Sequence, residues 1–160
     1  MKHLIIIIAA VAFSVAAQAD ETHHCSDVEH RGDHVMGFSD ETTKHAFKLY
    51  TDGGAIEVRV LKAGDEETLS MVRMHLQHIA DAFAKGDFSD PMAIHATDHP
   101  DGADVMRAKK SSIVYRYSDI EGGGAVRITT SDAAALDAIH RFMKFQIDEH
   151  KTGDTTGVSR

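Results

Sequence analysis

The strongest constraint on the fold is an order of features that occurs twice in the chain. Alternating apolar residues flank a glycine-rich turn, first in residues 45–61 and again in residues 112–130. Such alternation around a glycine turn is typical of a β-hairpin. Each predicted hairpin is followed by a stretch with the apolar period of an amphipathic helix, over residues 66–85 and residues 133–151.

The two predicted helices carry their apolar residues in the same register. Spacings of three and four residues alternate along both, which places these side chains in one stripe on a helix. The sequence therefore predicts an α+β fold, a two-layer sandwich built as a ββα-ββα pseudo-repeat. Its sheet would be four-stranded and mostly antiparallel, with two helices on one face. The alternative is that any two amphipathic helices can be aligned in this way.

The first residues have the features of a secretory signal peptide. Residues 4–13 are almost wholly apolar, and Ala17-Gln18-Ala19 has the small-x-small form of a cleavage site. The apolar run is too short for a permanent membrane anchor. We therefore expect residues 1–19 to be removed near Ala19 and the protein to be periplasmic or secreted.

The rest of the chain is predicted to contain one folded unit. Polar residues without an apolar period suggest a His-rich flexible N-terminal arm over 20–43. A single α/β domain is expected over 44–153 and a disordered tail over 154–160. The long connection between the two halves contains residues 92–95 as a candidate short strand.

Charge and cysteine content exclude several classes of protein. The formal net charge is −8, which argues against binding to nucleic acid or to anionic lipid. The single cysteine, Cys25, cannot form an internal disulfide. It is left as a free thiol, an intermolecular bridge or a metal ligand.

The central functional prediction concerns the stretch "SMVRMHLQH" on the first helix. His75 and His78 are three residues apart and so are neighbours on a helix, on a side away from its apolar stripe, with Met71 and Met74 beside them. Imidazole and thioether groups together favour copper, especially Cu(I). A solvated helix face that happens to hold two histidines is the alternative.

Further metal ligands are expected from other parts of the chain. The chain has 12 histidines, of which His45 and His95 are candidate partners of the helix site. His23, His24 and Cys25 would form a second, looser capture site in the arm. Their spacing matches no closed zinc motif, so zinc is the second choice of metal. The arm could equally be a polar leader that merely contains histidines.

The second helix differs from the first at the equivalent positions. Phe142 and Phe145 occupy the positions equivalent to His75 and His78 of the first helix. Exposing two aromatic side chains to water is unfavourable, so another segment should pack against this face. The connecting segment, the arm or a second subunit could supply it. This suggests a different function, a homodimer or a non-metal interaction module of the cell envelope. His150 falls on the apolar stripe near the helix C-terminus, where the helix dipole favours a cation.

Recognisable catalytic motifs are missing, so no enzyme is predicted. The runs "HVMGFSDETTKHAFKLYTDGGAIEV", "HLQHIADAFAKGDFSDPMAIH" and "HRFMKFQIDEHKTGD" resemble a family of small secreted bacterial proteins, some of them labelled aspartate carbamoyltransferase. That activity needs two α/β domains and a Ser-Thr-Arg-Thr type phosphate loop, which this sequence does not have. The resemblance implies secretion but no particular mechanism. The sequence thus predicts a periplasmic protein that sequesters or delivers a metal ion, with copper as the first choice.

Overall fold

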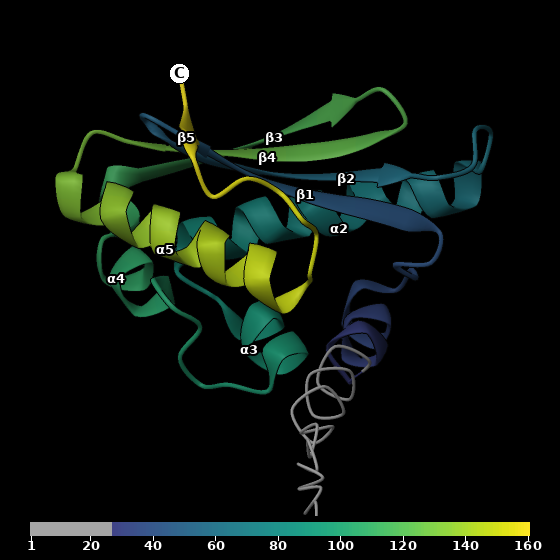
Figure 1. Ribbon diagram of the computed structural model, residues 1–160, viewed down its shortest axis with the longest axis horizontal. Helices are drawn as coiled ribbons and strands as arrows, with labels where there is room; N and C mark the ends of the chain where they lie inside the picture. Colours follow the sequence, from purple (N-terminus) through teal and green to yellow (C-terminus); the bar gives the residue numbers. More distant parts are fainter. Residues whose placement is uncertain (1–26) are drawn as a thin grey trace, which may run out of the picture.

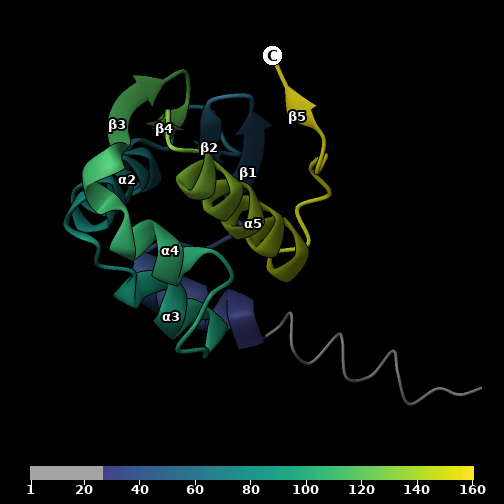
Figure 2. The ribbon, with the colours of Figure 1, turned by 90° about the vertical axis from the view of Figure 1, so that its left-hand side faces the viewer.

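The computed structural model describes residues 27–160. The predicted signal peptide and the candidate ligands His23, His24 and Cys25 lie outside these residues. The described part has an α+β fold in which one sheet is covered by helices on one face (Figures 1 and 2). The α+β prediction is therefore confirmed.

The sheet has five strands, one more than predicted. Their order is β3-β4-β2-β1-β5, with β5 parallel to β1 and every other neighbouring pair antiparallel. The fifth strand comes from the predicted disordered tail and is only two residues long, too short to have an apolar period of its own. The strands are β1 (Thr43–Tyr50), β2 (Gly53–Val60), β3 (Ile113–Ile120), β4 (Gly123–Thr130) and β5 (Val158–Ser159).

Two long helices lie against the sheet, and shorter helices form a further layer beneath them (Figure 2). α2 lies mainly against β3 and β4, whereas α5 lies mainly against β1 and β2. Within residues 27–160, no helix is long and apolar enough to cross a membrane. The helices are α2 (Glu66–Lys85), α3 (Ser89–His95), α4 (Ala103–Ala108), the 3-10 helix η1 (Lys110–Ser112) and α5 (Ala133–Glu149), and residues 27–36 are also helical.

The ends of the two long helices follow from local chemistry. The Asp65 side chain accepts a hydrogen bond from the backbone N–H of Thr68 and so caps the start of α2. Gly86 ends this helix in the left-handed conformation, with φ 81°. The Asp132 side chain caps α5 by accepting from two backbone N–H groups. These boundaries agree with those expected from the sequence, apart from two residues at the end of α5.

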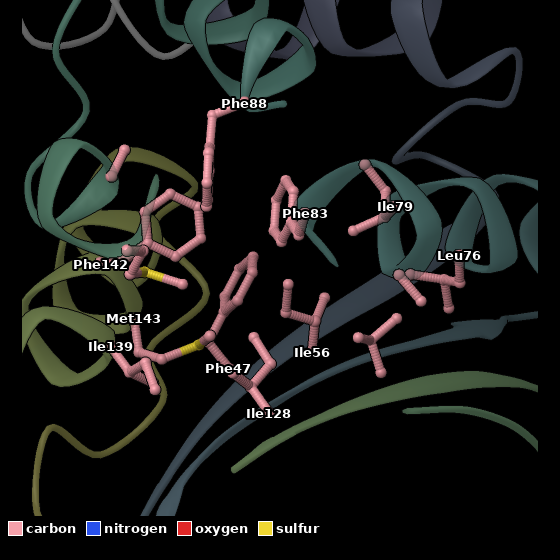
Figure 3. Close-up of a cluster of buried hydrophobic side chains, with 14 of the residues drawn as sticks. Phe47, Ile56, Leu76, Ile79, Phe83, Phe88, Ile128, Ile139, Phe142 and Met143 are labelled. Atoms are coloured by element: carbon pink, nitrogen blue, oxygen red, sulfur yellow. The ribbon is translucent and has the colours of Figure 1, made fainter. Parts of the chain in front are cut away.

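The core lies between the sheet and the two long helices (Figure 3). Phe142 is 1% exposed, and its ring meets those of Phe83 and Phe88 edge to face. Phe88 belongs to the short segment between α2 and α3, which therefore packs over α5. Of the predicted aromatic face, Phe142 is thus covered by the chain itself, whereas Phe145 is half-buried, with its ring against that of His95.

Two segments differ from their predicted structure. Residues 27–43, assigned to a flexible arm, include the helical residues 27–36, of which Val28 is fully buried and Met36 is 9% exposed. Residues 92–95, the candidate strand, belong to helix α3. Pro91 is compatible with this helix because it lies in the first turn, where proline is tolerated, and the Asp87 carboxylate accepts a hydrogen bond from the N–H of Ser89 just before it.

Candidate functional site

Helix α2 brings the four residues of the predicted metal site to one surface pocket. Met71, Met74, His75 and His78 all line it, and Met36 joins them from the end of the helical residues 27–36. We name this the methionine–histidine pocket. It encloses about 700 Å³, its wide opening to solvent included. The remaining lining residues are Val35, Gly37 and Asp90.

The donor groups of this pocket differ in their exposure. Met74 is 68% exposed, whereas Met71 and His75 are half-buried. His78 is exposed, and its Nε2 lies 3.4 Å from Oδ2 of Asp90 on α3. The pocket thus has three thioether groups, two imidazoles and one carboxylate around an opening that solvent reaches.

His75 stands at the boundary between this pocket and the interior. Its ring meets Phe38 edge to face, with the ring centroids 5.6 Å apart. Burial lowers the pKa of His75 to about 4; the nearby Asp90 carboxylate opposes this effect and His78 adds to it. The imidazole is therefore neutral near pH 7, which is the form that binds a metal ion.

A second pocket, the inner pocket, lies behind His75. It encloses about 470 Å³, its opening included, and it shares Met36, His75 and Asp90 with the methionine–histidine pocket. Two further imidazoles, those of His45 and His150, reach it from β1 and from the end of α5. The other lining residues are Phe47, Ile56, Val58, Leu76, Ile79, Phe83, Pro91, Ile94, Phe142 and Gln146.

The rings of the inner pocket form a stack. The ring of His150 is nearly parallel to that of His45, at a centroid distance of 5.6 Å, and meets that of His95 edge to face at 4.9 Å. Burial lowers the pKa of His45 to about 4, and His75 adds to the effect. Burial lowers the pKa of His150 to about 3, with smaller contributions from His45 and His95. The position of His150 on the apolar stripe indicates a buried or half-buried structural histidine, and the half-buried ring agrees with this; at this site burial outweighs the preference of the helix dipole for a cation.

His95, a candidate ligand, occupies an enclosed position on α3. Its side chain has 0% exposure, and its Nε2 lies 3.1 Å from Oε1 of Gln146, while its Nδ1 lies 3.5 Å from Oε2 of Glu149. Burial lowers the pKa of His95, although Gln146 and Glu149 act in the opposite direction. His95 is not among the residues that line either pocket.

The predicted site residues are therefore only partly brought together. Met71, Met74, His75 and His78 share one pocket, His45 lies in the adjoining pocket, and His95 lies behind it. Within residues 27–160, no three His, Cys, Asp or Glu side chains are grouped closely enough to hold a metal ion.

Sequence reasoning missed Met36 and Gln146. Met36 falls in the predicted arm, because the apolar residues that anchor its helix, such as Val28, recur too sparsely to give a clear period. Gln146 lies on the apolar stripe of the second predicted helix, and a polar residue in such a stripe is the signal that could have found it. Scans against protein-family models, curated proteins and solved structures gave no match to this chain.

Proposed function

We propose that the protein binds Cu(I) in the methionine–histidine pocket, for sequestration or delivery. The observation that supports this most is the gathering of Met36, Met71, Met74, His75 and His78 around one open pocket. Thioether and imidazole groups are ligands that Cu(I) prefers, and few other biological cations accept thioether sulfur. Zinc is the second choice of metal, because its sites are built from thiolate, imidazole and carboxylate.

The side chains of this pocket suit capture and release of an ion. Methionine is unbranched with three rotatable bonds, so the exposed Met74 and half-buried Met71 can move towards an ion at small cost. His75 remains neutral well below pH 7, so it can bind copper in mildly acidic surroundings as well. Asp90 adds a negative charge at the edge of the pocket.

The sequence supports further proposals about location and origin. We infer export to the periplasm after cleavage near Ala19, with His23, His24 and Cys25 as a second capture site. We also infer that the chain is a ββα-ββα pseudo-repeat. In support, β2 and β4 pair symmetrically. Gly53, the first residue of β2, pairs with Thr129, the seventh of β4, and Gly123, the first residue of β4, pairs with Arg59, the seventh of β2.

The copper proposal is tested by competition titration of Cu(I) with a chromogenic chelator. The parent protein carries His23→Ala, His24→Ala and Cys25→Ala, which removes the arm ligands and leaves the pocket. We expect one Cu(I) per chain and a loss of affinity of tenfold or more, about 1.4 kcal/mol, in the Met71→Leu/Met74→Leu variant. Met92→Leu is the matched control, since Met92 lies on α3 and lines neither pocket.

Two results would contradict the proposal. One is an unchanged Cu(I) affinity when both methionines of α2 are replaced in a protein whose circular dichroism is unaltered. The other is tight binding of Zn²⁺ with no binding of Cu(I). Metal analysis of the protein from its native periplasm would show which ion it carries there.

A further inference from the structure

The inner pocket has the walls of a binding site for an uncharged molecule. Its sides are mainly apolar, from strands (Phe47, Val58) and from α2 (Ile79, Phe83). Asp90 is the single carboxylate among its lining residues, and it also lines the methionine–histidine pocket. None of the residues that line this pocket is Lys or Arg, so an anion would find no opposite charge there.

One polar group in the wall lacks a partner. Gln146 is 5% exposed, its Oε1 lies 3.1 Å from Nε2 of His95, and its Nε2 has no hydrogen-bond partner within residues 27–160. A buried amide N–H that is left without a hydrogen-bond partner destabilises the folded chain. Gln146 lines the inner pocket, so its unpaired Nε2 is a hydrogen-bond donor for an acceptor atom on a bound molecule.

A second polar group stands next to this amide. His150 follows Gln146 by four residues, so the two side chains lie on the same side of α5, and both line the inner pocket. No hydrogen bond is made by the ring of His150 to any other described residue of the chain. A neutral imidazole has one nitrogen that donates and one that accepts. A single hydroxyl group can accept from the amide of Gln146 and donate to this imidazole.

We propose that the inner pocket binds a small neutral molecule with an apolar, ring-sized body and one hydroxyl group, as in a phenol. The body would lie among Ile79, Phe83 and Phe142, and the hydroxyl would meet Gln146 and His150. Met36 and His75 line both pockets, so the ligand would pass between them from the methionine–histidine pocket into the inner pocket. This binding does not require a metal ion.

The test uses three fluorinated probes with the same ring, followed by ¹⁹F NMR in the presence of a metal chelator. We expect 4-fluorophenol to bind with a dissociation constant in the millimolar range or lower. Fluorobenzene, which lacks the hydroxyl group, should bind about fivefold more weakly. The anion 4-fluorobenzoate should not bind at pH 7, because no Lys or Arg lines the pocket. In Gln146→Met the preference for 4-fluorophenol over fluorobenzene should disappear. Gln77→Met is the matched control, because Gln77 is exposed on α2.

A second measurement needs no variant. In the wild-type protein labelled with ¹³C at its methionine methyl groups, 4-fluorophenol should shift the signal of Met36, which lines the pocket, and leave that of Met92 in place. Absence of binding by 4-fluorophenol, an equal affinity for fluorobenzene in the wild type, or an unmoved Met36 signal would each overturn the proposal. Because copper is excluded, none of these results depends on the outcome of the Cu(I) titration.

Discussion

The imidazole rings of His45 and His150 lie face to face, with their centroids 5.6 Å apart and their planes 8° from parallel. One ring comes from β1 and the other from the C-terminal cap of α5, so the contact joins the two halves of the chain. Phe47 stacks on His150 from the same strand. Such a stack is stable only while the two imidazoles are uncharged, since two imidazolium ions at this distance repel each other.

The first prediction concerns the dependence of stability on pH. Burial lowers the pKa of His45 and of His75 to about 4, and that of His150 to about 3, from an ordinary value of 6.5. As the pH falls below 6.5, the unfolded chain takes up protons that the folded chain does not. The free energy of unfolding should therefore decrease from pH 6.5 to pH 4, by about 1.4 kcal/mol per pH unit for each histidine that remains neutral.

Urea unfolding at pH 7.5, 6 and 5 measures this slope. The carboxylates of Asp90, near His75, and of Glu149, near His95, attract protons and make the slope smaller. The His150→Phe variant keeps a ring in the stack but cannot be protonated, so its slope should be smaller than that of the wild type. A stability that stays constant from pH 7.5 to pH 5 would show that these imidazoles are hydrated.

The second prediction concerns the close approach of β2 to β4. A Cβ atom on Gly53 would overlap the carbonyl oxygen of Ile128, and one on Gly123 would overlap that of Val58. Glycine is required wherever two backbones approach this closely. We expect Gly53→Ala and Gly123→Ala each to lower the free energy of unfolding by roughly 3 kcal/mol or more.

Gly122→Ala is the control for these two variants. Gly122 has a φ of +62° but open space around its Cβ position, so alanine there adds only backbone strain, about 1 kcal/mol. All three variants are compared by urea unfolding at pH 7.5. Equal losses at the three positions would mean that the overlap is relieved by a small movement of the strands.

The third prediction concerns Phe142, whose ring meets the stacked rings of Phe83 and Phe88 edge to face. Phe142→Ala should lower the free energy of unfolding by about 3–5 kcal/mol, because it leaves a cavity where α5 meets the segment before α3. The mass in solution, measured by light scattering, should not change. If this face were instead an interface between copies of the chain, the variant would change the mass and leave the stability of the monomer almost unaltered.

Local patterns in the sequence predicted local structure, and failed where contacts join distant segments. The apolar period, the capping Asp65 and the final Gly86 are all within or beside α2, so this helix and its Met71–His78 face could be predicted. The pairing of His45 with His150 joins the first strand to the end of the last long helix, and no periodicity describes it. The contact between Gln146 and His95 likewise joins α5 to α3, and no local pattern in either segment describes it.

The last prediction concerns the segment after α5, which protects the edge of β1. An edge strand presents unpaired N–H and C=O groups that can pair with another chain. Here the N–H of Phe47 donates to Oδ2 of Asp154 at 2.8 Å, and the N–H of Thr51 donates to the carbonyl oxygen of Ser159 at 3.1 Å. The hydroxyl of Thr152 also donates to the Asp154 carboxylate, which fixes its position beside the strand.

Asp154→Ala should remove the charged acceptor of Phe47 and cost about 1–3 kcal/mol, whereas Asp154→Asn keeps an oxygen acceptor and should cost less. Asp148→Ala, at an exposed position of α5, is the matched control. Because the loss is local, hydrogen exchange of the Phe47 amide should accelerate in Asp154→Ala more than exchange in β4, the strand beyond β2. Equal acceleration in both strands would mean that Asp154 supports the whole sheet, since its contact would then break only when the entire domain unfolds.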